Sequence, residues 1–243
     1  MGLTPEALYV ELGHLLTEMP DLAEGAITAE TEHWLDNAAE LVEASSSLAD
    51  ALQLGVAAGN LNGPLRARNA ETIAEIVRRA LVRAEADAPA TSQGMFIVAK
   101  DPYEALAAVR RILITARIEV LLVDPLADAK MLTDVAVHIP EKVVVRVLAD
   151  EDEHGRWLES AAQRWFQRFG STRPLFVRLA AAGVLRDTLI LVDGTAAWAL
   201  RQPFHRLAKC SYLSLVRIPP DAVSAMIVAS AARWDAAHPM FKE

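Results

Sequence analysis

Charged and hydroxyl side chains stand immediately before an apolar segment that is otherwise suited to a protein core. Arg186, Asp187 and Thr188 precede residues 189–192, and Asp193 follows them. A guanidinium group stays protonated at any relevant pH and has no lone pair, so Arg186 can bind an anion but cannot act as a nucleophile. Thr188 can donate one hydrogen bond but supplies no charge. Packing explains the apolar segment, whereas the polar residues before it require another explanation.

Helical and strand patterns alternate around this segment. Apolar, β-branched stretches predict strands, and apolar residues at helical spacing predict helices. Strands are expected at residues 95–98, 118–123, 142–148, 175–179, 185–192, 196–200 and 212–218. Helices are expected at residues 102–115, 156–169 and 219–234. This alternation predicts an α/β fold with a mixed sheet that is covered by helices on both faces.

The first part of the chain shows helical periodicity only. Residues 1–92 are therefore predicted to form an N-terminal helical domain, and residues 93–243 to form the α/β domain. Apolar residues mark the first three helices, of which the second opens at Thr28. A break at residues 59–64 precedes a fourth helix, which carries five arginines.

Charge is distributed unevenly between these parts. Residues 1–65 contain eleven carboxylates and no Lys or Arg, so they carry −11, while the whole chain carries −8 and the remainder +3. We expect the acidic helices to pack close to the arginine-rich fourth helix. Their outer surface is interpreted either as a solvated acidic face or as a docking face for a basic protein partner, and in both cases it repels nucleic acid.

Composition indicates a globular, cytoplasmic protein. Apolar residues make up 53% of the chain, which allows a well-filled core. No apolar stretch approaches the length of a membrane-spanning helix, and the acidic N-terminus is unlike a signal peptide. The single cysteine, Cys210, has no partner for a disulfide, which fits a reducing compartment.

Motifs for metals and cofactors are absent from the sequence. The six histidines lack the spacing of a metal site, and the acidic run at residues 150–153 is typical of a solvated loop. There is no glycine-rich phosphate loop, serine-hydrolase elbow or dinucleotide-binding motif. No metal and no cofactor are therefore expected. The five tryptophans stand at apolar positions and are expected in the core.

The order of the elements and the spacing around the apolar segment resemble the phospholipase D superfamily, specifically its bacterial single-motif members. In that family one strand carries the motif H-x-K-x4-D, often with Arg in place of Lys, followed by G-S-x-N. Here Arg186, Thr188 and Asp193 occupy the positions of His, Lys and Asp. The resemblance covers about residues 95–237.

The resemblance implies covalent catalysis on a phosphodiester, in which histidine attacks phosphorus and a neighbouring cation binds the non-bridging oxygens. This chain departs from that pattern, since Arg186 replaces the nucleophile and Thr188 replaces the cation. Only Asp193 matches, so the catalytic set is not intact and the motif is degenerate. Pairing of two single-motif chains in the family implies a homodimer, which we expect to form through the sheet edge near residues 185–205.

Three functions remain open from the sequence. The first is a non-catalytic pseudoenzyme that acts as a dimeric interaction or regulatory scaffold, with or without residual phosphate binding. The candidates for phosphate binding are Arg186, Arg201, His205 and Lys209. The second is a nucleic-acid-binding protein, which the acidic total charge opposes. The third is a phosphodiesterase or nuclease whose active site has been rewired around His205.

Overall fold

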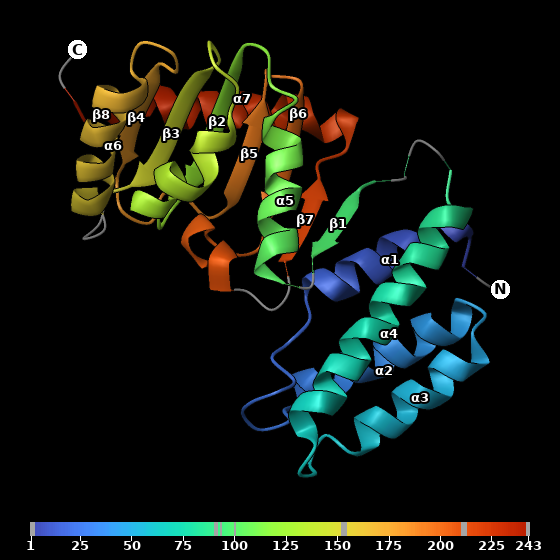
Figure 1. Ribbon diagram of the computed structural model, residues 1–243. Coiled ribbons are helices and arrows are strands. Elements are labelled where there is room, and N and C mark those ends of the chain that lie inside the picture. Colours follow the sequence, from blue (N-terminus) through green and yellow to red (C-terminus); the bar gives the residue numbers. More distant parts are fainter. Residues whose placement is uncertain are drawn as a thin grey trace. The chain divides into compact units, whose positions relative to one another are not determined.

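The structure is a computed structural model in which residues 3–89, 92, 94–99, 101–151, 155–209 and 213–241 are described. The chain divides into two compact units, Met1–Gly94 and Met95–Glu243 (Figure 1). Helices α1 to α4 belong to the first unit, and a sheet with its covering helices belongs to the second. None of the helices in the described ranges has both the length and the apolar character needed to cross a membrane.

Four helices form the first unit, as the sequence predicts. They are α1 (Pro5–Thr17), α2 (Ala29–Ala44), α3 (Leu48–Gly59) and α4 (Arg66–Asp87). The hydroxyl groups of Thr4, Thr28 and Ser47 accept hydrogen bonds from main-chain N–H groups in the first turns of α1, α2 and α3. These caps satisfy donors that have no partner within the helix, and so they fix where the three helices begin.

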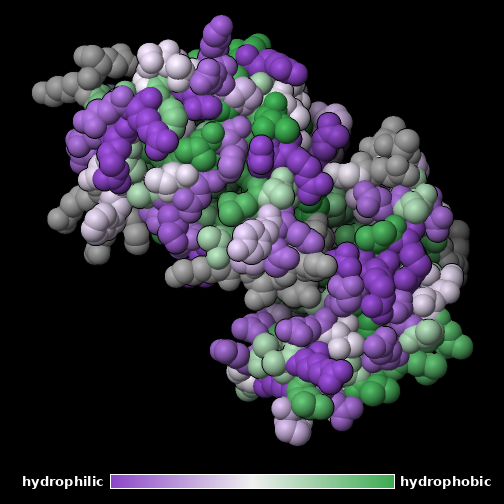
Figure 2. Space-filling view, in the orientation of Figure 1, coloured by the Kyte–Doolittle hydropathy of each residue, from purple (hydrophilic) through white to green (hydrophobic). Residues whose placement is uncertain are grey.

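The helices enclose an apolar core of their own. Tyr9, Leu12, Leu54 and Ile73 are at most 1% exposed. The indole N–H of Trp34 donates a hydrogen bond to the carbonyl oxygen of Leu15 at 2.9 Å, which joins α2 to α1 without leaving a buried donor unpaired. Some apolar side chains stay outside this core, and Figure 2 shows hydrophobic surface over the region where Figure 1 places α3.

Acidic and basic helices pack against each other, which confirms the expectation from the charge distribution. Asp50 of α3 is buried, and its carboxylate oxygens lie 2.6 Å from Arg79 and 2.8 Å from Arg83 of α4. Burial alone raises the pKa of the Asp50 carboxyl, but the hydrogen bonds and charges of the two guanidinium groups outweigh it and hold that pKa below its ordinary value. The ion pair therefore fastens α3 to α4 most strongly when Asp50 is ionised.

An eight-stranded mixed sheet forms the centre of the second unit, in the order β1-β7-β6-β5-β2-β3-β4-β8. The strands are β1 (Phe96–Ala99), β2 (Glu119–Asp124), β3 (Val144–Asp150), β4 (Leu175–Ala180), β5 (Thr188–Val192), β6 (Ala196–Leu200), β7 (Leu213–Arg217) and β8 (His238–Pro239). Strands β2, β3 and β4 are parallel, whereas β5 pairs antiparallel with both β2 and β6. The predicted mixed sheet is confirmed, and β8 is a short addition that the sequence did not indicate.

Helices cover both faces of the sheet (Figure 1). On one face lie α5 (Pro102–Leu113), α6 (Gly155–Phe169), a π-helical turn, η1 (Met131–Val135), and two 3-10 segments, η2 (Ala136–His138) and η3 (Phe204–Lys209). On the other face lies α7 (Pro220–Ala236). The sequence predicted α5, α6 and α7 but none of the short helical turns.

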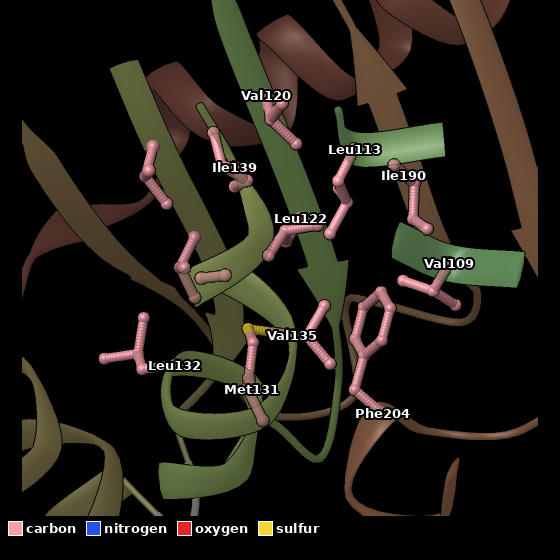
Figure 3. Close-up of a cluster of buried hydrophobic side chains, with 14 of the residues drawn as sticks. Val109, Leu113, Val120, Leu122, Met131, Leu132, Val135, Ile139, Ile190 and Phe204 are labelled. Atoms are coloured by element: carbon pink, nitrogen blue, oxygen red, sulfur yellow. The ribbon is translucent and has the colours of Figure 1, made fainter. Parts of the chain in front are cut away.

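Alternation along the strands supplies a core to each face. Val120 and Leu122 of β2 belong to the cluster under α5, while Val123 belongs to the cluster under α7. Figure 3 shows Val120 and Leu122 among side chains of the first cluster, including Leu113 of α5 and Met131 of the π-helical turn. β2 and β3 are therefore buried on both faces of the sheet up to their carboxyl ends.

The strand that carries the motif lies inside the sheet. β5 begins at Thr188, three residues later than predicted, because residues 185–187 form a loop. Both β5 and β6 have hydrogen-bonded neighbours on each side, and the outermost strands of the sheet are β1 and β8. The expectation that a dimer forms through a sheet edge near residues 185–205 is therefore wrong, since these strands have no free edge to offer.

One of the tryptophans expected in the core is exposed. Trp157 is 67% exposed, whereas Trp34, Trp165 and Trp234 are buried. Trp157 lies in the first turn of α6, and helical side chains tilt toward the N-terminus of their helix. Its ring therefore projects beyond the turns of α6 that pack on the sheet.

Replacing Asp50 with Asn is expected to lower the free energy of unfolding of the first unit by about 1–2 kcal/mol at neutral pH, because Arg79 and Arg83 lose their carboxylate partner. The wild-type contribution is present above the ordinary pKa of 3.8 and is lost as the pH falls through the lowered pKa of the folded state. Urea unfolding followed by circular dichroism across this pH range tests the expectation. Asp36→Asn, at an exposed carboxylate of α2, is the control, and equal pH dependence of wild type and Asp50→Asn would contradict it.

Candidate functional site

Strands β2, β3, β5 and β6 are among those that present an end at one edge of the sheet. β2 and β3 are parallel and finish there at Asp124 and Asp150. β5 runs antiparallel to β2 and begins there at Thr188, which pairs with Leu200 at the end of β6. This edge is termed the carboxyl edge below. In open α/β sheets ligands bind outside the carboxyl ends of the strands, so the carboxyl edge is the candidate site.

Asp124 holds the chain that follows β6. It is fully buried, and its Oδ1 and Oδ2 accept hydrogen bonds from the N–H groups of Leu126 at 2.9 Å and Phe204 at 2.8 Å. The Phe204 ring is buried in the core cluster of Figure 3. Burial raises the pKa of the Asp124 carboxyl above its ordinary value, outweighing these hydrogen bonds and the nearby charge of His205, which lower it.

Asp150 holds the loop that leads into β5. It is 6% exposed, and its carboxylate accepts hydrogen bonds from the N–H groups of Gly183 at 2.8 Å and Leu185 at 3.1 Å. Gly183 has φ of +79°, a left-handed conformation that favours glycine. The expectation of a solvated acidic loop at residues 150–153 is therefore wrong for Asp150, while residues 152–153 lie outside the described part of the chain.

The two altered motif positions differ sharply in accessibility. Arg186 is exposed on the loop held by Asp150, and within the described residues its guanidinium has no ion pair or hydrogen bond. Thr188 is the first residue of β5 and is only 6% exposed. Arg186 is thus available to a ligand at the carboxyl edge, and Thr188 is part of the core.

Asp193, the motif residue that matches the family, lies at the opposite edge of the sheet. Its carboxylate accepts hydrogen bonds from the main-chain N–H groups of Arg117, Ile118 and Glu119, at 2.8 to 3.2 Å. Burial alone raises the pKa of the Asp193 carboxyl, but these hydrogen bonds and the charge of Arg117 hold it below its ordinary value. Asp193 stands five residues after Thr188, which is about 17 Å along an extended strand. Asp193 therefore fastens the turn after β5 to the start of β2.

The other candidates for phosphate binding follow β6. Arg201 comes directly after Leu200 and is exposed, so Arg186 and Arg201 adjoin the same end of the β5–β6 hairpin. His205 is half-buried in the 3-10 segment beside Asp124, and its Nδ1 is buried without a hydrogen-bond partner among the described residues. Lys209 ends that segment, and its side chain is outside the described part.

The two buried carboxylates of the carboxyl edge are already bound by the main chain. Asp124 and Asp150 are occupied by main-chain donors, and the described residues contain no cluster that could hold a metal ion. From the sequence, no role is assigned to Asp124, and Asp150 is placed in a solvated loop. A buried strand that finishes in Asp was the available signal, because a carboxylate at that position needs donors from a neighbouring loop.

Comparisons with known proteins find similarity in structure only. No protein-family model and no curated protein matches the sequence. A solved structure of Nuc, a phospholipase D family member from Salmonella typhimurium, is similar over 60% of this chain and 98% of its own, with 17% identity and a TM-score of 0.45. NucT from Helicobacter pylori covers 60% of this chain and 99% of its own, with 11% identity and a TM-score of 0.38.

A third similar structure belongs to TrmBL2, an archaeal chromatin protein whose structure is described as showing a novel mode of DNA binding. It covers 79% of this chain and 71% of its own, with 14% identity and a TM-score of 0.40. The predicted α/β class is confirmed by the structure itself, in which N-terminal helices precede a mixed sheet that is flanked by helices.

Replacing Asp193 with Ala is expected to lower the free energy of unfolding by about 2–4 kcal/mol, because several main-chain N–H groups lose their acceptor and Ala must adopt the φ of +51°. Asp193→Gly removes the second cost and should be less destabilising. The wild-type contribution is present above pH 3.8 and disappears as the pH falls through the lowered pKa. Urea unfolding of both variants measures this, with Asp187→Ala as an exposed control, and an unchanged Asp193→Ala protein would refute it.

Proposed function

We propose that this chain is a non-catalytic, phospholipase D-like interaction protein, which acts as a dimeric scaffold and binds phosphate groups at the carboxyl edge. The observation that carries the proposal is the division of roles at that edge. Its buried carboxylates, Asp124 and Asp150, accept hydrogen bonds from loops, while Arg186 presents a guanidinium without an ion pair among the described residues.

The absence of catalysis is supported by the chemistry of the motif positions. Arg186 has no lone pair with which to attack phosphorus. Thr188 supplies no positive charge and is buried in the sheet. Asp193 is bound at the far edge, so it cannot orient a group at the carboxyl edge. The nucleophile and the cation of covalent phosphodiester cleavage are therefore missing, and Asp193 alone cannot replace them.

Phosphate binding is supported by the way Arg186 is held. The hydrogen bonds from Gly183 and Leu185 to Asp150 fix the loop on which Arg186 stands. Because the main chain is already fixed, binding costs no further backbone freedom, and the planar guanidinium matches two oxygens of a phosphate group. Arg201 lies at the same end of the hairpin and adds positive charge.

The protein partner of the scaffold is proposed to bind the acidic helices. Residues 1–65 carry −11 without a single Lys or Arg. Among these carboxylates Asp50 is neutralised by Arg79 and Arg83, but many others are exposed, including Glu11 on α1 and Glu40 on α2. A surface of one sign attracts a partner of the opposite sign and speeds their encounter at low salt.

Titration of the chain with inorganic phosphate, followed by calorimetry, tests the binding site. Wild type is expected to bind with a dissociation constant on the order of millimolar, and Arg186→Gln should raise it at least about tenfold, since a charge-assisted hydrogen bond is lost. Arg117→Gln, at the opposite edge of the sheet, should bind as wild type does. Equal affinity of all three proteins would contradict phosphate binding at Arg186.

A rewired phosphodiesterase is the second candidate, favoured by one observation. The buried Nδ1 of His205 has no hydrogen-bond partner among the described residues and lies beside the Asp124 carboxylate. Hydrolysis of bis(4-nitrophenyl) phosphate that disappears in His205→Ala would establish this alternative and overturn the non-catalytic proposal. A salt-dependent mobility shift of DNA that is lost in Arg186→Gln would instead identify nucleic acid as the phosphate ligand.

A further inference from the structure

Helix α3 exposes an apolar stripe on the side facing away from its own core. Leu48, Leu52 and Val56 are 75%, 64% and 66% exposed, and their spacing of four residues places them on one face of the helix. They lie opposite Leu54 and Ala57, which are buried. Single exposed apolar residues are ordinary, but three in a row on one helix form a continuous surface that marks an interaction site.

Gly55 and Gly59 lie next to this stripe, and nothing in the described chain requires glycine at either position. Gly55 and Gly59 are exposed, their φ values are not positive, and a Cβ atom added at either would meet nothing within 4 Å. Glycine within an exposed helix costs about 1 kcal/mol relative to alanine. Because glycine has no side chain, a second helix can approach the α3 main chain closely at these positions.

Opposite charges flank the stripe. On α2, Asn37 and Leu41 line a cavity with α1, so Glu32, Asp36 and Glu43 lie on the side of α2 toward α3 by helical spacing. On the other flank α4 presents arginines toward α3. Arg79 and Arg83 bind Asp50 there, and their side chains remain 40% and 37% exposed. The stripe is therefore bordered by carboxylates on one side and guanidinium groups on the other.

We propose that α3 pairs with α3 of a second copy of this chain, side by side and parallel, around a two-fold axis that runs along the stripe. A two-fold interface uses the same surface on both copies, so that surface must complement itself. Rotation about this axis places α2 of each copy opposite α4 of the other. Carboxylates then face guanidinium groups at both borders, and Leu48, Leu52 and Val56 meet their own counterparts at the centre.

The antiparallel arrangement of the same helices is excluded by charge. A two-fold axis perpendicular to α3 would place α2 against α2 and α4 against α4, which brings like charges together at both borders. A different protein would need its own apolar stripe with the reversed order of charges, whereas a second copy supplies this pattern by symmetry. This pairing assigns the dimer of the proposed function to the surface of α3. It does not depend on phosphate binding at Arg186.

The oligomeric state of the full chain tests the surface. Analytical ultracentrifugation is expected to show a dimer for wild type, and Leu52→Glu should raise the dissociation constant at least about a hundredfold, since the change counts twice in a symmetric interface. Val82→Glu is the matched control, because Val82 is also exposed, at 53%, but lies on the side of α4 where Glu85 binds Tyr9 of α1. Circular dichroism confirms that both variants are folded.

Disulfide cross-linking tests the direction of the helices. In a Cys210→Ser background, Leu48→Cys and Val56→Cys are each expected to form a dimer through a disulfide on mild oxidation, whereas Glu40→Cys on α2 should not. The two positions are about 12 Å apart along α3, and a disulfide requires Cα atoms within about 7 Å. A parallel pair can satisfy both positions, but an antiparallel pair cannot.

Three outcomes would overturn the pairing: a monomeric wild type at high protein concentration, a dimer unaffected by Leu52→Glu, or failure of Leu48→Cys or Val56→Cys to cross-link. Each result is separate from the phosphate titration. Loss of the dimer in Leu52→Glu with unchanged phosphate affinity would support both proposals independently. A wild-type dimer that binds no phosphate would support the α3 pairing and contradict only the phosphate site.

Discussion

Carboxylates that accept hydrogen bonds from main-chain N–H groups fix the loops of the second unit. An ionised carboxylate without partners would cost several kcal/mol in the interior, so each of these groups requires a loop to supply donors. Asp150 receives the loop before β5, Asp124 receives the chain after β6, and Asp193 receives the chain before β2. The positions of Arg186 and His205 follow from these constraints.

The same constraint separates structure from chemistry. A carboxylate whose oxygens are occupied by main-chain donors at 2.8 to 3.1 Å is a poor general acid or base, because proton transfer would break the contacts that maintain its loop. The guanidinium of Arg186 is exposed at the same edge and makes no such structural contact with the described residues. In the first unit Asp50 has a comparable role with guanidinium donors, and it too joins one element to another rather than serving a ligand.

Much of the fold was readable from the sequence because the local and the global signals agree. The caps at Thr28 and Ser47, the break before α4 and the buried strands β2 and β3 combine apolar periodicity with suitable boundary residues. The loop at residues 185–187 was read as strand, since a hydrogen bond from Leu185 to a distant carboxylate leaves no trace in local sequence.

The site was less predictable, for the same reason. The motif spacing predicts that Asp193 and Arg186 belong to one site. An extended strand instead places its two ends at opposite edges of the sheet, so the two residues lie far apart. The π-helical turn and the exposure of Trp157 also depend on packing between distant elements. The acidic and basic helices were matched correctly because charge complementarity does not require the contact geometry to be known.

Main-chain atoms, rather than side chains, attach the loop of Arg186 to Asp150. Different residues therefore determine the stability of the carboxyl edge and its ligand chemistry. Arg186 can therefore be replaced, and the chemistry at the tip of the loop can change, while the hydrogen bonds that hold the loop stay the same.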